Sequence, residues 1–412
     1  MGPLQIYDRR ERALVTAADR LLALGVALTE PLRRRRAPAA PRRILLLRLE
    51  RIGDLLMVLP AIADLQALAA QAEIDLVVGS WNADLARAIR PIRRVHTLDA
   101  AWLARGGHGL GMYSLLRAAW GWRRERYDLV INFEPDARSN LLAASAGAAW
   151  TAGYRSGGGG ALLDLALDYD PRAHTTDNAR RLVTAALGPR DSGAALQAAA
   201  INPDAPIAVP PVLTIPAPAQ ASAARLLGAV DGPLIGIHVS GGRAIKQWPP
   251  DRFAEVARRL IDEAGGTIVL TGSRDDRPLV QTMRRELPPD RTIDLAGDID
   301  LLALGAILGR LDVLLTGDTG PMHLAHAVAT PIVAVFGPSD PARYAPRGSL
   351  DRVVRVDLPC SPCNRIRLPP ARCTGHTPDC LRFVNADAVF SAVMSVLSAV
   401  RRAPVPLDAP TA

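Results

Sequence analysis

The sequence predicts an α/β protein made of two doubly wound, Rossmann-like domains, and three observations support this prediction. Short apolar runs typical of buried strands alternate with segments of helical periodicity. The alternation occurs twice, first from residue 43 and again from residue 234. The proline-rich stretch 201–218 separates the two series and is interpreted as a linker. We therefore expect two lobes that face a cleft, a common place for a ligand.

The first series begins with a strand over 43–49 and a turn that contains Asp54. Further strands are predicted at 74–78, 95–98 and 127–133, with helices at 55–70, 83–89 and 115–126. Pro60 falls inside the first helix, which should start late or bend. Asp54 follows the carboxyl end of its strand, where open parallel sheets bind ligands. Residues 151–215 show the least regular pattern, although a helix could begin at 174–178.

The second series repeats the pattern of the first. Strands are predicted at 234–239, 267–270, 292–295, 311–315 and 331–336, with helices at 251–264, 276–287, 301–308, 321–328 and 387–400. We expect the last helix to pack back on the first domain. The predicted domains are a helical N-terminal segment at 1–42, a first domain at 43–215, a second domain at 216–400 and a tail at 401–412, and a length of 412 residues fits two domains.

The stretch 317–323 carries the most chemical information, because it joins a buried strand to a helix through a glycine-rich turn. Its glycines let backbone N–H groups approach a ligand, and the start of the helix favours phosphate. Asp318 repels phosphate but suits sugar hydroxyls, so the turn indicates a nucleotide-sugar. The alternative that Asp318 only caps the helix stays open.

Charge and composition narrow the function further. The formal net charge is +8, but residues 1–43 hold ten arginines and four acidic residues, which account for +6 of it. A chain-wide nucleic-acid surface is therefore not expected. The chain contains one lysine, Lys246, where every other basic residue apart from histidine is arginine. Either this site requires a compact ammonium group or the lysine survives by chance.

The N-terminal segment supports two interpretations. Residues 8–32 have an amphipathic helical pattern, and four consecutive arginines follow at 33–36. One interpretation is a peripheral anchor that binds anionic lipid through residues 8–36. The other is a helix packed on the body of the protein. The pattern shows neither a transmembrane segment nor a signal peptide, so we expect a cytoplasmic protein. The first interpretation would add a peripheral place on the inner face of the cytoplasmic membrane.

Four cysteines lie within 21 residues, with one C-x₂-C pair. They are Cys360, Cys363, Cys373 and Cys380. This spacing is compatible with a structural zinc site, with disulfide or redox pairing, or with reduced thiols that have no special role. His376 is a further potential ligand. A catalytic role for these thiols is not expected.

Three segments in this order resemble glycosyltransferase family nine, the bacterial heptosyltransferases of lipopolysaccharide core assembly. They are RILLLRLERIGDLLMVLPAIADL from residue 43, HVSGGRAIKQWPPDRFAEVARRL from residue 238 and TGDTGPMHLAHAVATPIVAVFGPSDP from residue 316. The resemblance covers about residues 43–400, and the third segment is the most specific. The arginine-rich N-terminal helix lies outside it.

The resemblance implies a GT-B fold, with the donor held by the second domain. It also implies transfer of a heptose from an ADP-sugar to an acceptor hydroxyl, with inversion at the anomeric carbon and no catalytic metal or other cofactor. Asp54 would be the general base, Lys246 would meet the donor diphosphate and Asp318 would bind the donor sugar. The remaining assignments are Ser240, Thr319, Gly320 and His323 around the donor, and Arg51 and Gly53 on the acceptor side.

The chemistry of the residues agrees with these assignments. Inversion needs one base on the face opposite the leaving group, and Asp54 is the carboxylate in the first-domain turn. A diphosphate leaving group needs positive charge, which one lysine and helix N-termini can supply. Two alternatives stay open: the same chemistry with another nucleotide-sugar and acceptor, or a nucleotide-binding module without catalytic activity. For Asp54, the alternative role is a helix N-cap.

Overall fold

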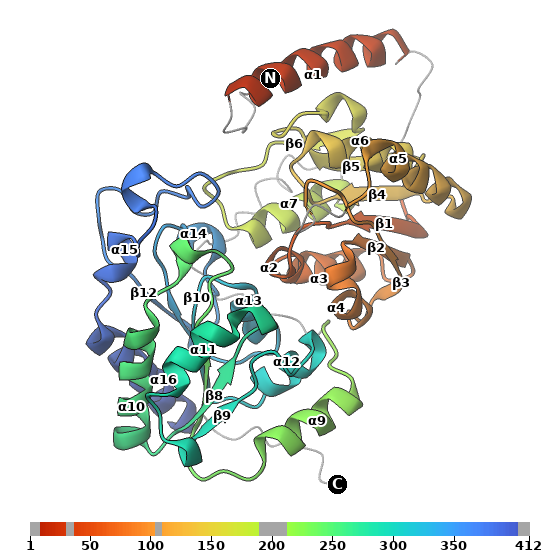
Figure 1. Cartoon of the computed structure of the whole chain (residues 1–412). Helices are drawn as coiled ribbons and strands as arrows, with labels where there is room; N and C mark the ends of the chain where they lie inside the picture. The colour runs from red at the N-terminus through yellow and green to blue at the C-terminus, as the bar shows by residue number, and fades with distance from the viewer. Residues whose placement is uncertain (1–8, 30–36, 104–108, 189–211, 403–412) are drawn as a thin grey trace. The chain divides into compact units, whose positions relative to one another are not determined.

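The computed structural model describes residues 9–29, 37–103, 109–188 and 212–402. Among these, the chain forms two compact units, and the boundary lies between Thr214 and Ile215. The predicted arginine run 33–36, most of the predicted linker 201–218 and most of the tail 401–412 lie outside the described residues. Figure 1 shows the first unit in red to yellow-green and the second in green to blue.

The first unit is built on a parallel sheet of six strands in the order β3-β2-β1-β4-β5-β6. The strands are β1 (Arg43–Leu47), β2 (Glu73–Val78), β3 (Ile92–Thr97), β4 (Leu129–Asn132), β5 (Trp150–Tyr154) and β6 (Leu165–Leu167). The last two were not predicted, because they are short and lack a long apolar run. Strand β1 lies in the middle of the sheet and is fully buried over Ile44–Leu47, as expected for a strand covered on both faces.

The first unit also contains helices. They are α1 (Arg9–Thr29), α2 (Ile52–Leu56), α3 (Leu59–Leu68), α4 (Ala83–Arg87), α5 (Met112–Gly121), α6 (Ala137–Ser145) and α7 (Thr175–Leu187). The helix predicted at 55–70 is two helices, because Pro60 occupies the first turn of α3, where its missing N–H costs nothing. Helices α5 and α6 contribute Leu115, Ala119, Leu142 and Ala143 to a core with the strands, and α3 contacts α7.

The second unit repeats this architecture with a parallel sheet in the order β12-β11-β10-β7-β8-β9. The strands are β7 (Leu234–His238), β8 (Thr267–Thr271), β9 (Thr292–Asp294), β10 (Val313–Gly317), β11 (Ile332–Val335) and β12 (Arg352–Val354). Five of the six were predicted, and β12 is the exception. When the strands of each unit are counted in chain order, both sheets have the Rossmann order 3-2-1-4-5-6.

The helices of the second unit are α9 (Ala217–Leu227), α10 (Pro250–Ala264), α11 (Arg277–Arg284), α12 (Leu301–Leu308), α13 (Gly320–Ala327), α14 (Pro341–Tyr344), α15 (Asp379–Arg382) and α16 (Ala386–Arg402). Helix α9 begins inside the stretch predicted as a linker. Helix α16 packs against α10 and the sheet of the second unit through Val389, Val393 and Val396, so its predicted place on the first domain is wrong. Helices α12 and α13 contact each other and α9 contacts α12.

The strand order places one switch point in each sheet, where the chain direction across the sheet reverses. In the first unit it lies between β1 and β4, and in the second between β7 and β10. Ligands of open parallel sheets bind outside the carboxyl ends of the strands at this position. The segments that leave these four strands are therefore where functional side chains are expected.

Candidate functional site

The predicted site residues lie at the two switch points. In the first unit, Asp54 follows β1. In the second unit, Ser240 and Lys246 follow β7, and Asp318 and Thr319 follow β10. We call the residues at the first switch point the first half-site and those at the second the second half-site, and each is described within its own unit.

Asp54 is held in place by hydrogen bonds from two directions. Its Oδ1 accepts a hydrogen bond from Arg48 Nη2 at 3.1 Å, and its Oδ2 accepts one from the backbone N–H of Arg51 at 3.3 Å. The side chain of Asp54 remains 24% exposed. Arg51, rather than Asp54, is the N-cap residue of α2, and Asp54 is the third residue of that helix. Asp54 nevertheless caps the helix start, because its side chain accepts from the Arg51 backbone in a capping box, so a helix-capping role stays open. A fixed and partly exposed carboxylate of this kind is suited to accept a proton.

Arg48 and Glu134 support this carboxylate from within the protein. Arg48 Nη1 donates to Glu134 Oε2 at 3.0 Å, and both side chains are about 95% buried, with 4% and 5% exposed. Glu134 Oε1 accepts hydrogen bonds from the backbone N–H groups of Leu49 and Glu50, which ties the end of β4 to the turn after β1. Arg48 Nε also donates to the carbonyl oxygen of Asp54. The first half-site is therefore a spatial row in which buried Glu134 pairs with buried Arg48, and Arg48 contacts the partly exposed Asp54.

Burial and neighbouring charges shift the pKa values of Glu134 and Arg48 in opposite directions. Burial raises the pKa of Glu134, and the positive charge of Arg48 opposes that rise. Burial would lower the pKa of Arg48, but the carboxylates of Glu134 and Asp54 raise it, so the guanidinium stays charged. A permanently charged arginine therefore lies beside the carboxylate of Asp54, with its Nη2 3.1 Å from Asp54 Oδ1.

Sequence reasoning missed both Arg48 and Glu134. Arg48 interrupts the apolar run of the first strand, and Glu134 directly follows the strand predicted at 127–133. Charged residues at these two positions are the signal that could have identified them, because β1 and β4 are neighbours at the switch point. Of the two residues assigned to the acceptor side, Arg51 is exposed and Gly53 lies partly exposed in the first turns of α2.

The second half-site brings together Lys246 and Asp318, which were predicted separately. Lys246 Nζ lies 2.7 Å from Asp318 Oδ2, and their side chains are 19% and 12% exposed. Burial would raise the pKa of Asp318, but Lys246, Ser339 and His323 lower it, so the carboxylate stays ionised. The one lysine of the chain thus comes from the loop after β7 and contacts the acid in the 317–323 turn that was assigned to sugar hydroxyls.

Helix α13 begins two residues after Asp318. Thr319 is its N-cap residue, and the Thr319 hydroxyl accepts a hydrogen bond from the backbone N–H of Met322 at 3.3 Å. The alternative that Asp318 only caps this helix is therefore wrong. Gly320 is the first residue of α13, and His323 is buried in the same helix. The start of α13 directs backbone N–H groups and a positive field toward this half-site.

Ser240 has a partner that the sequence did not indicate. It hydrogen-bonds the carboxylate of Asp276, and this bond and those from Ser273 lower the pKa of Asp276 against the opposing effect of burial. His238, at the end of β7, is buried and donates to or accepts from Thr271 Oγ1 at 3.1 Å. Burial lowers the pKa of His238 to about 4, so this histidine is neutral near pH 7. Asp276 and His238 thus support the loop after β7.

That loop is folded tightly enough to require glycine. A Cβ atom on Gly241 would lie 2.9 Å from the carbonyl carbon of Lys246, and Gly242 has a φ of +64°. The first contact is closer than real Cβ atoms approach backbone, and the second conformation favours glycine. The two glycines therefore let the chain turn back so that Lys246 reaches Asp318.

The four cysteines are present as free thiols, with Cys360 exposed and Cys380 buried. Cys363 donates its backbone N–H to Pro338, and Leu381, next to Cys380, contacts Gly337. Burial raises the pKa of Cys380 to about 11, with smaller contributions from the other three cysteines. Within the described residues, no three His, Cys, Asp or Glu side chains are grouped as metal ligands. The structural zinc site stays a prediction.

Metal analysis of the purified protein tests this prediction. A structural site would give about one equivalent of zinc or iron per chain, and replacement of Cys363 and Cys380 by serine would remove it together with part of the thermal stability. No control variant with serine at other positions is needed, because the metal content of the double variant itself reports the loss of the site. Less than half an equivalent in the unmodified protein would contradict the prediction.

Comparisons with known proteins show which family the chain is similar to. Residues 116–369 match the sequence profile described as Glycosyltransferase family 9 (heptosyltransferase). Lipopolysaccharide heptosyltransferase 2 of Escherichia coli is 27% identical over 311 residues, which cover 74% of this chain and 85% of that protein. Lipooligosaccharide heptosyltransferase 2 of Haemophilus influenzae is 31% identical over 114 residues, but this match covers 27% of this chain and 33% of that protein.

A solved structure shares the fold. The structure of E. coli ADP-heptose lps heptosyltransferase II has a TM-score of 0.69 and 22% identity, and the match covers 87% of this chain and 99% of that chain. This likeness confirms the predicted α/β fold with two Rossmann-like domains.

Proposed function

The chain is a member of glycosyltransferase family 9, and we propose that it transfers a heptose from an ADP-sugar to a hydroxyl group of a lipopolysaccharide-core acceptor. The observation that carries this proposal is the complementary chemistry of the two half-sites. The first offers a fixed carboxylate, and the second offers an ammonium group, a carboxylate and the start of a helix. The carboxylate of the first half-site can accept the proton of an acceptor hydroxyl. The three groups of the second half-site can bind the diphosphate and the sugar of a nucleotide-sugar.

In the proposed reaction, Asp54 accepts the proton of the attacking hydroxyl. Attack on the face opposite the nucleotide inverts the anomeric carbon, forms the new glycosidic bond and releases ADP. Arg48 keeps the carboxylate of Asp54 oriented, with a hydrogen bond of 3.1 Å. One base is sufficient for a single displacement, so no second carboxylate has to act at the anomeric carbon.

The second half-site neutralises the leaving group. We propose that Lys246 Nζ and the backbone N–H groups at the start of α13 bind the diphosphate, where charge increases in the transition state. Lys246 then exchanges its contact with Asp318 for the phosphate oxygens, and Asp318 becomes available to sugar hydroxyls. This division of roles needs no catalytic metal. The name of the E. coli structure supports ADP-heptose as the donor.

A donor screen tests the identity of the nucleotide-sugar. Purified protein is incubated with ADP-, UDP- and GDP-sugars, with and without acceptor, and the released nucleotide is measured. Fastest release from ADP-heptose in the presence of a lipopolysaccharide-core acceptor supports the proposal. Preference for a UDP- or GDP-sugar would be compatible with transferase activity but would contradict ADP-heptose as the donor.

Replacement of Lys246 by alanine should weaken ADP binding about 10- to 100-fold, because a hydrogen bond between charged groups contributes about 1.5–3 kcal/mol. Isothermal titration calorimetry with ADP measures this effect. Arg243→Ala is the matched control, since Arg243 is an exposed cation on the same loop. Equal losses in the two variants would show that Lys246 has no specific contact with the diphosphate.

A further inference from the structure

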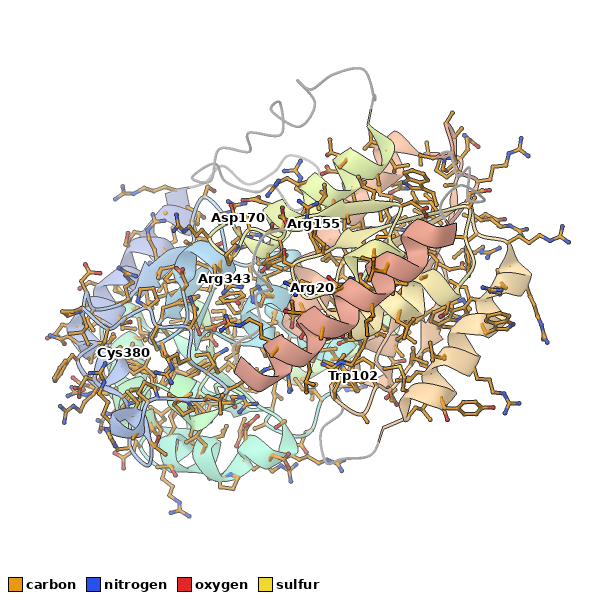
Figure 2. All side chains as sticks on the ribbon, turned by 90° about the horizontal axis from the view of Figure 1, so that it is seen from above. Arg20, Trp102, Arg155, Asp170, Arg343 and Cys380 are labelled. Carbon is orange, nitrogen blue, oxygen red and sulfur yellow. The ribbon has the colours of Figure 1, made fainter. Side chains whose placement is uncertain are left out.

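The N-terminal helix α1 is attached to the first unit by a buried acid. Asp19 is 5% exposed, and its Oδ1 accepts a hydrogen bond of 2.7 Å from the backbone N–H of Gly159. Helix α1 contacts the short helical turn Gly160–Leu162 that follows. Figure 2 shows α1 lying along one side of the first unit, with Arg20 on it. One face of this helix is therefore fixed to the protein.

The opposite face of α1 is apolar and exposed. Leu14, Leu21 and Leu24 are 72%, 71% and 64% exposed. Their spacings of seven and three residues place them on one side of the helix, and Asp19 lies on the other side. The helix thus turns a polar residue toward the protein and a row of leucines toward solvent. This is the reverse of the usual arrangement in a surface helix, so the leucine row needs a partner.

The charge beside the leucine row is positive. Among the described side chains of residues 12–24, Arg20 is exposed four residues before Leu24 and therefore next to it on the helix surface. Arg12 is exposed at the start of the helix, seven residues before Asp19 and on that side, and the one acid, Asp19, is buried. The exposed surface of this segment therefore combines leucine with arginine and no carboxylate. An apolar row with basic residues is the pattern that binds anionic lipid, where leucines enter the boundary between headgroups and acyl chains.

The point where α1 is attached lies on the side of the first unit where the carboxyl ends of its parallel strands meet, which is also the side of Asp54. Gly159 belongs to the loop after β5, and all strands of this sheet are parallel, so the loop lies at the same edge as Asp54 after β1. Asn140 fixes this loop, because its Nδ2 donates to the carbonyl oxygens of Tyr154 and Gly158 at 2.8 Å. A membrane bound to α1 would therefore lie near the edge that receives the acceptor.

We propose that the leucine row of α1, formed by Leu14, Leu21 and Leu24, binds the surface of an anionic lipid bilayer and presents the Asp54 edge to a lipid-linked acceptor. No helix in the described ranges is long and apolar enough to cross a membrane, which fits attachment at the surface. The role in presenting the acceptor rests on the proposed function. Lipid binding by the leucine row does not depend on it.

Vesicle flotation of the full chain tests lipid binding. The probes are phosphatidylglycerol–phosphatidylcholine vesicles and pure phosphatidylcholine vesicles. The triple variant Leu14→Ser, Leu21→Ser, Leu24→Ser should bind anionic vesicles at least about tenfold more weakly than the unmodified chain. The control is a triple variant with Leu68→Ser, Leu226→Ser and Leu368→Ser, which replaces exposed leucines elsewhere and should bind normally. Wild-type binding should also fall with added salt.

Two outcomes would overturn the proposal. One is equal vesicle binding by the unmodified chain and the α1 variant. The other is a self-associated chain that becomes monomeric in the α1 variant without any vesicle binding, since the leucine row would then contact a second copy. Light scattering after size-exclusion chromatography distinguishes these states.

Asp19→Ala separates attachment from lipid binding. This variant should bind anionic vesicles within about threefold of the unmodified chain, but its transfer to an acceptor embedded in vesicles should fall relative to transfer to a water-soluble acceptor fragment. An unchanged ratio of the two rates would contradict the presenting role of α1. Absence of all transfer by the unmodified chain would instead contradict the proposed function, and the flotation result would stand.

Discussion

Asp54→Asn should lower the rate of sugar transfer by about 10²- to 10⁴-fold, the usual contribution of a general base. The amide has nearly the shape of the carboxylate and can still accept a hydrogen bond from Arg48 or from the backbone of Arg51. It cannot accept the proton of an acceptor hydroxyl. The dissociation constant for ADP should stay within about twofold, because the donor contacts are assigned to the second unit.

Asp64→Asn is the matched control for this prediction. Asp64 lies on α3, is 29% exposed against 24% for Asp54, and also pairs with an arginine, Arg180. Its replacement should leave the transfer rate nearly unchanged. Initial rates with saturating donor and acceptor measure both variants. A rate near that of the unmodified protein for Asp54→Asn would show that Asp54 is not the base and would contradict this mechanism.

Arg48→Met should lower the free energy of unfolding by about 3–5 kcal/mol, as expected when one partner of a buried ion pair is removed. The variant leaves the carboxylate of Glu134 buried, with hydrogen bonds from the backbone of Leu49 and Glu50 but no positive partner from Arg48. It also removes the hydrogen bond to Asp54, so activity should fall together with stability. Urea unfolding followed by circular dichroism measures the change.

An exposed ion pair of the same unit provides the comparison. Arg155 pairs with Asp168, and their side chains are 44% and 57% exposed. Arg155→Met should cost at most about 1 kcal/mol because solvent screens this pair. The double variant Arg48→Met, Glu134→Gln should recover part of the stability, since the buried charge is then removed. Equal costs for Arg48→Met and Arg155→Met would show that the Arg48–Glu134 pair is not important for folding.

Much of the fold could be predicted from the sequence, because its central strands are long apolar runs. The strands that were missed, β5, β6 and β12, lie toward or at the edges of their sheets. Short strands of this kind carry a weak pattern, since β6 and β12 have three residues each and no fully buried side chain. Pro60 was correctly recognised as a disturbance, although it starts a second helix rather than bending one.

The sequence predicted individual residues of the two half-sites better than it predicted the contacts between those residues. Asp54, Lys246 and Asp318 follow strands, and a turn after a buried strand is visible in sequence. The pairing of Lys246 with Asp318 depends on β7 and β10 being neighbours, which is a property of the topology rather than of local sequence. The same reason explains why the pair of Arg48 and Glu134 was missed. These residues are 86 positions apart and meet because β1 and β4 are adjacent.

The most direct test of the proposed mechanism is the configuration of the product formed from ADP-heptose and a lipopolysaccharide-core acceptor in the presence of EDTA. Nuclear magnetic resonance of the new glycosidic linkage measures it. We predict transfer at an unchanged rate with inversion at the anomeric carbon, since Asp54 acts as the base and Lys246 supplies the positive charge. Retained configuration, or transfer that stops with EDTA and resumes with a divalent cation, would contradict this mechanism.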